Sequence, residues 1–198
     1  GWTAFANGGY KIEPYLIERI EDRDGKRVFE ANPARIPTHD RASADEQQAA
    51  LSYARSDTLL TDDAGAASQQ PVQAEQVIDE RTAYIMTSML QDVIKRGTGR
   101  KALAMGRADI AGKTGTTNES KDSWFSGYNA DIVTTVWAGF DQPQSLGRRE
   151  YGGTVALPIW MKYMSSVLEG MPEHAPAEPE GILTLRIDPR SGRAAAPG

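Results

Sequence analysis

The chain has 198 residues, of which 39% are hydrophobic and 25% charged, with a net charge of −5. These values are typical of a soluble globular protein with one sizeable core. The acidic balance argues against nucleic acid as a partner. No cysteine is present, so neither a disulfide nor a thiolate metal site can form. The two histidines, His39 and His174, lie far apart in polar loops, so we expect no metal site.

The first residues, GWTAFANGGY, read as the last turn of a helix that closes on residues 7–9, where glycine supplies a left-handed cap. They contain no basic leader. No apolar run approaches the roughly 20 residues that span a bilayer. Because the sequence starts inside a helix, we expect it to be a fragment of a longer protein.

A strand is expected over residues 14–20, with a turn at 22–25 and a returning strand at 27–30. Residues 32–76 differ in composition, being rich in Ala, Gln, Asp and Ser and poor in large apolar side chains. We expect this stretch to be an inserted flexible loop, because it cannot bury much apolar area. Within it, residues 44–54 are compatible with a short helix and residues 61–72 with a flexible segment.

The clearest helix covers residues 78–96, because its apolar side chains recur at three- and four-residue spacing. Asp79 is expected to be its N-cap, and Gly97 to end it. The apolar face consists of Ile78, Ile85, Met86, Met89, Leu90, Val93 and Ile94.

Residues 108–116 and 122–128 are expected to pair as an antiparallel hairpin, because a polar turn separates an apolar strand from an aromatic one. Residues 131–140 should form a third strand, whose β-branched run suits burial on both faces. The predicted fold class is therefore α+β, an antiparallel sheet flanked by helices.

Pro158 is expected to open a further helix, which Gly170 ends. Residues 171–181, rich in Pro, Ala and Glu, should form a linker. Residues 182–198 should then form a C-terminal extension with a strand at 182–187 and a turn after it.

The run GKTGTT at residues 112–117 carries the chemistry of the chain. Alternate side chains of a strand point the same way, so Lys113 and Gly115 share one face and Thr114 and Thr116 the other. The spacing alone predicts an edge strand that presents a cation and hydroxyl groups.

The wider context resembles the penicillin-binding proteins, the serine transpeptidases that cross-link peptidoglycan. Six segments carry the resemblance in the correct order, and they span almost the whole chain apart from the insert: TAFANGG, GTG, GKTGTT, DSWFSG, VWAGFD and ALPIW. The combination of GTG and GKTGTT resembles class A, the bifunctional type that also carries a glycosyltransferase domain. The family's Ser-x-x-Lys and Ser-x-Asn motifs are absent from this sequence.

The resemblance implies the C-terminal part of a transpeptidase domain with a serine β-lactamase-like fold, formed by residues 1–31 and 77–170. It gives catalytic roles to Lys113, which places positive charge near the nucleophile, and to Thr116, whose N–H is one of two oxyanion-hole donors. A threonine hydroxyl and the lysine charge would hold a substrate carboxylate. The implied substrate contacts are Thr114, Gly115, Thr116, Trp124 and Tyr128.

The complete enzyme is expected to acylate a serine outside this chain with a D-Ala-D-Ala stem peptide and pass the acyl group to another stem's amine. β-Lactams would block that serine. The expected partners are these ligands and the remainder of the same domain, and this chain alone should be inactive. The family acts at the periplasmic face of the inner membrane, held by an N-terminal anchor that this sequence lacks.

Three other functions compete with this interpretation. A P-loop nucleotide binder is excluded, because five residues rather than four separate Gly106 from Gly112 and no helix start follows. A non-catalytic cell-wall-binding module stays open, as does a β-lactamase or D,D-carboxypeptidase relative, although GTG and DSWFSG favour the transpeptidase.

Two further groups are expected to have structural roles. Asp122 is expected to cap the turn of the hairpin rather than act in catalysis. A basic cluster is expected to be a solvated helix end: Lys95, Arg96, Arg100, Lys101 and Arg107.

Overall fold

A computed structural model of the chain describes residues 1–37, 72–188 and 190–194. The chain divides into two compact units, one of residues 1–9 with 77–198 and one of residues 10–76. All of the motif-bearing strands lie in the first unit. The domain boundaries inferred from composition stay predictions, and so does the role of the insert.

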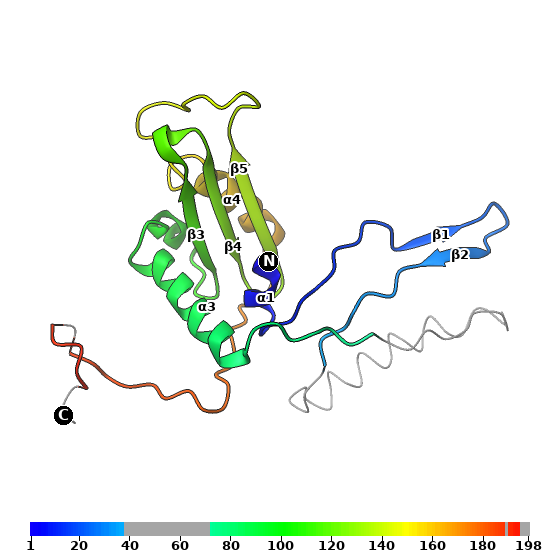
Figure 1. The fold of residues 1–198 in the computed structure, drawn as a ribbon, viewed down its shortest axis with the longest axis horizontal. Coiled ribbons are helices and arrows are strands. Elements are labelled where there is room, and N and C mark those ends of the chain that lie inside the picture. Colours follow the sequence, from blue (N-terminus) through cyan, green and yellow to red (C-terminus); the bar gives the residue numbers. More distant parts are fainter. Residues whose placement is uncertain (38–71, 189, 195–198) are drawn as a thin grey trace. The chain divides into compact units, whose positions relative to one another are not determined.

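The first unit is built on a three-stranded antiparallel sheet with the order β3-β4-β5 (Figure 1). Its strands are β3 (Ala111–Thr116), β4 (Ser123–Tyr128) and β5 (Val133–Ala138). All three predicted strands are present, and each is shorter than expected. The third cannot begin at Asp131, because the N–H groups of Asp131 and Ile132 donate to Asn129 Oδ1 at 3.1 and 2.9 Å and close the β4–β5 turn instead.

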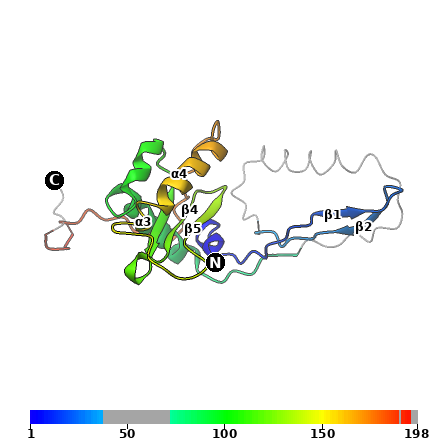
Figure 2. The same cartoon turned by 90° about the horizontal axis from the view of Figure 1, so that it is seen from above.

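Helix α4 (Ala156–Val167) covers one face of the sheet and α1 (Trp2–Ala6) lies on the other (Figure 2). Phe125 of β4 meets Trp160 of α4 with ring centroids 4.9 Å apart. The 3₁₀-helix η1 (Arg100–Met105) adds Ala102 to this core. Helix α4 begins two residues earlier than predicted, with Pro158 inside its first turn, where a missing N–H costs nothing.

Helix α3 (Glu80–Lys95) confirms the predicted N-cap, because Asp79 Oδ1 accepts from Arg81 N at 3.1 Å. Its Leu90 packs with Ala111 and Tyr128, on the face of the sheet opposite Phe125. Gly97 follows Arg96, the C-cap of the helix, and a Cβ at residue 97 would come within 2.9 Å of Val93 Cα.

The second unit contains the hairpin of β1 (Arg19–Glu21) and β2 (Arg27–Glu30). Its turn is as predicted, with Asp22 Oδ1 accepting from the N–H groups of Asp24 and Lys26, both at 2.9 Å. Strand β1 starts later than the predicted 14–20. Every residue of the two strands is exposed, so burial within them does not favour a longer pairing. The predictions for residues 44–54 and 61–71, and for His39, lie outside the described residues.

The predicted strand over residues 182–187 is wrong. The structure has only an isolated bridge between Ile187 and Ala194 there, and Leu183, Leu185 and Ile187 are exposed. An alternating apolar pattern forms a strand only where a neighbouring strand and a core are available, and none of the described strands reaches it. The turn after it does form, because Asp188 accepts from Arg190 N and Ser191 Oγ. None of the described helices could cross a membrane.

Candidate active site

Strand β3, which carries Lys113, is an edge strand of the described sheet. Among the strands that the structure describes, β3 has β4 on one side and no strand on the other. Lys113 is exposed, and its ammonium group donates to the Thr114 carbonyl oxygen at 2.7 Å. Register places Lys113 opposite Ser126 and Gly115 opposite Trp124, so these four residues share one face.

The backbone at Thr116 faces the same edge. Thr117 N donates to Asp122 O at 3.1 Å, so residue 117 bonds toward the β4 side of the hairpin. Successive residues of an antiparallel strand alternate in the direction of their N–H groups. The N–H of Thr116 therefore points away from β4, where it can donate to an anion placed along the edge.

The two threonine hydroxyls of β3 lie on the face opposite Lys113. Thr114 Oγ1 is 2.7 Å from Thr98 Oγ1, and Thr116 Oγ1 accepts from Gly152 N at 3.0 Å. A ligand along the edge would have an ammonium group on one side and hydroxyls on the other. This arrangement suits a carboxylate, which accepts hydrogen bonds from both.

The absence of a side chain at Gly115 leaves room for Trp124, its neighbour across the sheet, as well as for a ligand. A Cβ at this position would lie 3.1 Å from Trp124 Cβ. The sequence pattern favoured glycine here because a substrate backbone could approach. The structure adds a second reason, which is that the Trp124 side chain rises directly beside it.

Trp124 has an aromatic partner, Trp137, that the sequence does not reveal. The rings of Trp124 and Trp137 lie 6.1 Å apart at 44°, and the two residues are 41% and 46% exposed. Trp137 Nε1 donates to Asp122 Oδ1 at 2.9 Å. Asp122 also accepts from Thr117 Oγ1 at 3.1 Å, which confirms that it caps the turn. Trp137 could be recognised as the partner of Trp124 only from the register of β4 and β5, which a single sequence does not provide.

Tyr128 is not brought to this edge. It lies at the far end of β4 from Ser123, the partner of Thr116, and it is 2% exposed. Its hydroxyl is 2.8 Å from Thr87 Oγ1. Burial raises the pKa of the Tyr128 phenol, although the bond to Thr87 works against this. Tyr128 therefore lies in the core beside α3 rather than in a groove next to Lys113.

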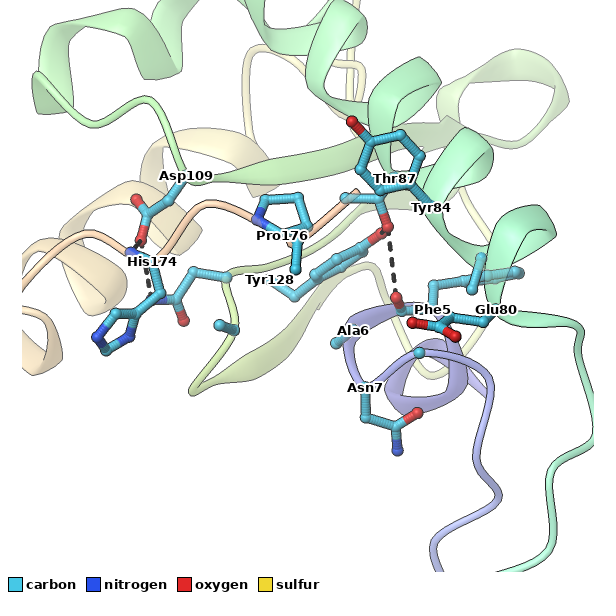
Figure 3. A pocket seen from close by; sticks show the side chains of 15 residues that line it. Phe5, Ala6, Asn7, Glu80, Tyr84, Thr87, Asp109, Tyr128, His174 and Pro176 are labelled. Atoms are coloured by element: carbon cyan, nitrogen blue, oxygen red, sulfur yellow. Dashed lines mark hydrogen bonds between the residues drawn. The ribbon is translucent and has the colours of Figure 1, made fainter. Parts of the chain in front are cut away.

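A cavity of about 230 Å³ lies at this far end of the hairpin (Figure 3). Phe5, Tyr84 and Tyr128 line it, together with the buried carboxylate of Asp109. Burial by itself raises the pKa of Asp109, but hydrogen bonds from Arg107, Asn129 and His174 N outweigh burial and leave the pKa below its ordinary value. The carboxylate is thus ionised and already paired, so it is not free to hold a ligand or act as a base.

The prediction that Arg107 belongs to a solvated basic cluster is wrong. Its guanidinium pairs with Asp109 at 2.7 Å, and the two side chains are 12% and 1% exposed. The remaining members, Lys95, Arg96, Arg100 and Lys101, are exposed as expected. His174 lies beside the pair, with Nδ1 3.3 Å from Asp131 Oδ2. In the described parts of the chain, no group of three or more acidic or histidine side chains could hold a metal ion.

Comparisons with known proteins match both the sequence and the fold. A family described as "Penicillin binding protein transpeptidase domain" matches residues 2–165. The chain is 59% identical to penicillin-binding protein 1A of Pseudomonas aeruginosa, with 100% of this chain and 25% of the relative covered. It is 41% identical to penicillin-binding protein 1A of Neisseria gonorrhoeae, over 92% of this chain and 19% of the relative.

Among solved structures, the crystal structure of penicillin-binding protein 1A from Haemophilus influenzae matches with a TM-score of 0.79 and 34% identity. The match covers 100% of this chain and 29% of that one. The chain therefore spans about a quarter of the length of the proteins it resembles.

Proposed function

The chain belongs to the penicillin-binding protein transpeptidase family, and on that basis we propose that it forms one wall of the acyl-transfer site of a peptidoglycan D,D-transpeptidase. The observation that carries the proposal is the edge of β3. It presents the Lys113 ammonium group on one face and the hydroxyls of Thr114 and Thr116 on the other.

The nucleophile would come from the rest of the transpeptidase domain. Its serine Oγ attacks the carbonyl carbon between the two D-alanines of a donor stem peptide, and the carbonyl oxygen becomes an oxyanion. The Thr116 N–H, which points away from β4, donates to this oxyanion. The Lys113 charge favours transfer of the serine proton to a base in the rest of the domain, which then passes it to the leaving nitrogen. One such donor is typically worth about 10²–10³ in rate.

The terminal D-alanine then leaves, taking a proton on its nitrogen, and an acyl-serine ester remains. The amine of a second stem peptide attacks this ester, and one of its protons passes through the same base to the serine oxygen, which leaves as the cross-linking amide bond forms. No cofactor takes part in either step. β-Lactams would acylate the same serine, because its Oγ can attack their ring carbonyl carbon and their carboxylate can accept from the same threonine hydroxyls.

Substrate binding along β3 follows from the same geometry. The carboxylate of the terminal D-alanine would accept from Thr114 and Thr116, with the Lys113 charge nearby. Gly115 leaves room for the peptide backbone, and Trp124 supplies an exposed aromatic wall beside it. Within the parent protein, this wall would face the periplasm, and the inner-membrane anchor would belong to another segment.

The alternative of a non-catalytic cell-wall-binding module is less well supported, because the family matched is named for its transpeptidase activity. A fluorescent penicillin tests the proposal. The full-length parent should be labelled at one serine outside this chain, and the isolated 198-residue chain should not be labelled. Labelling of the isolated chain at one of its own serines would refute the division of the site between segments, and an unlabelled, folded parent would refute the activity.

A further inference from the structure

We propose that Thr98 and the backbone N–H of Gly152 are positioning residues for carboxylate recognition, because they set the direction in which the Thr114 and Thr116 hydroxyls donate. The inference rests on the proposed function and goes beyond it. It gives a role to two segments that lie outside the catalytic strand: the Gly97-Thr98-Gly99 turn after α3 and the loop before α4.

The hydrogen bond from Gly152 N to Thr116 Oγ1 restricts the direction of the Thr116 hydroxyl proton. Gly152 N carries one hydrogen and can only donate, so Thr116 Oγ1 must accept at the observed 3.0 Å. The hydroxyl proton of Thr116 cannot point back along the same line. Because Thr116 is exposed, that proton is directed outward, where it can donate to an acceptor along the edge of β3.

The contact to Thr114 gives the same result when an anion is present. Thr98 Oγ1 and Thr114 Oγ1 are 2.7 Å apart, and either oxygen can donate to the other. A carboxylate accepts only, so its arrival requires Thr114 to donate to it. Thr98 then donates to Thr114, and the chain of hydroxyls becomes polarised toward the negative charge.

Glycines allow the loop before α4 to approach the sheet and the Gly97-Thr98-Gly99 turn to pack closely on its neighbours. A Cβ at Gly152 would lie 2.4 Å from Trp124 O and 2.7 Å from Gly115 O. A Cβ at Gly99 would lie 2.8 Å from Ile94 Cδ1, and one at Gly153 would lie 3.1 Å from Thr98 O. A side chain at Gly152 could not fit without moving the backbone. Because glycine occupies this position, the loop can lie close enough to β3 for Gly152 N to reach the Thr116 hydroxyl.

The loop also has its own internal support. Tyr151 N donates to Thr154 Oγ1 at 2.8 Å, and Leu157 N donates to Gly152 O at 2.8 Å. Gly152 is thereby tied to the first turn of α4, which packs against Phe125 under the sheet. The direction of the Gly152 N–H is thus set by the core rather than by the ligand, which is the condition for a preorganised donor array.

The test compares two acyl donors in the full-length parent protein. One is an N-acyl-D-alanyl thioester that ends in a free thioglycolate carboxylate, and the other is its neutral methyl ester. The variant Thr98→Val removes the hydroxyl at constant size, and Thr98→Ser restores it. For Thr98→Val we expect kcat/KM to fall by up to about tenfold with the carboxylate donor, the upper end of the scale for one hydrogen bond between neutral groups. With the methyl ester it should stay within about twofold, and Thr98→Ser should recover the loss.

The control is Thr82→Val, an exposed threonine on α3, which should change neither donor's rate. Thr98→Ala serves the same comparison if the valine methyl group disturbs the turn. An equal loss with both donors would show that Thr98 only supports the fold and would overturn the proposal, as would no loss with either. Failure of the wild-type parent to form an acyl-enzyme with the carboxylate donor would instead contradict the proposed function.

Discussion

Arg107 and Asp109 form a bidentate ion pair inside the domain, with Nε to Oδ1 at 2.8 Å and Nη2 to Oδ2 at 2.7 Å. The guanidinium also donates to the carbonyl oxygens of Met171 and Pro172 at 2.9 and 3.0 Å. The pair therefore fixes the start of the C-terminal segment to the end of the hairpin. The segment predicted as a linker has no helix or strand but is anchored at this point.

Replacing this arginine should be costly. Arg107→Met leaves the buried Asp109 carboxylate without its cation, and loss of one partner of a buried pair typically costs about 3–5 kcal/mol. Arg96→Met is the matched control, because Arg96 pairs with Asp92 at 2.7 Å on the surface, with 77% and 41% of the side chains exposed. Its expected cost is at most about 1 kcal/mol. Denaturant unfolding of the transpeptidase domain measures both, and similar costs would contradict the burial argument.

Asp109 should also make the domain acid-sensitive. Its pKa is lowered in the folded state from an ordinary value of 3.8, so its ionised form stabilises the fold at neutral pH. That stabilisation is fully present above the unfolded pKa and is lost as pH falls through the folded one. We expect the melting temperature to fall between about pH 5 and about pH 2. The Asp109→Asn variant should have a lower melting temperature at neutral pH and a smaller fall over that range. If the melting temperatures of the wild type and the variant fell in parallel, the acid sensitivity would belong to other groups.

The contact between Tyr128 and Thr87 should matter for stability and not for acylation. Tyr128→Phe removes the phenol oxygen and leaves Thr87 with its bond to Phe5 O at 3.3 Å. We expect a stability loss of about 1 kcal/mol, the usual net value of one hydrogen bond. The second-order rate of penicillin acylation should stay unchanged. A clear drop in that rate in a folded variant would indicate that Tyr128 contacts the substrate.

Trp124 should contribute to substrate binding from the exposed side of the sheet. Trp124→Ala removes an aromatic wall beside Gly115 and frees Trp137, whose indole N–H still has Asp122. We expect KM for a stem-peptide donor to rise about tenfold or more, since a large aromatic contact is worth about 1.5–3 kcal/mol when buried by a ligand. Steady-state kinetics on the parent measures this, and an unchanged KM would place the peptide elsewhere.

Local signals in the sequence predicted the parts of the fold that depend on neighbouring residues. The Asp79 cap, the end of α3 before Gly97 and the β3–β4 hairpin follow from side-chain type and spacing over a few positions. The face shared by Lys113 and Gly115 follows from the period of a strand.

Contacts between distant segments could not be predicted in this way. Thr98 and Gly152 reach β3 from 16 and 36 residues away, and Trp137 meets Trp124 only through the register of β5. Composition places Arg107 in a basic cluster, whereas its partner Asp109 and the C-terminal carbonyls bury it. The alternation of apolar residues at 182–187 predicts a strand, but an alternating segment forms a strand only where a partner strand is available to pair with it.

The edge of β3 is the proposed acyl-transfer site, and Lys113→Ala in the full-length parent is the variant that tests this proposal. The measurement is the second-order rate constant of acylation by a fluorescent penicillin, with unfolding followed in parallel. Lys121→Ala is the control, a lysine on the same hairpin that pairs with Glu119 at 2.8 Å. We predict a loss of at least about 10²-fold for Lys113→Ala with the fold intact, and no change for Lys121→Ala. A near-normal acylation rate in a well-folded Lys113→Ala variant would show that this lysine is only a surface residue and would refute the proposed site.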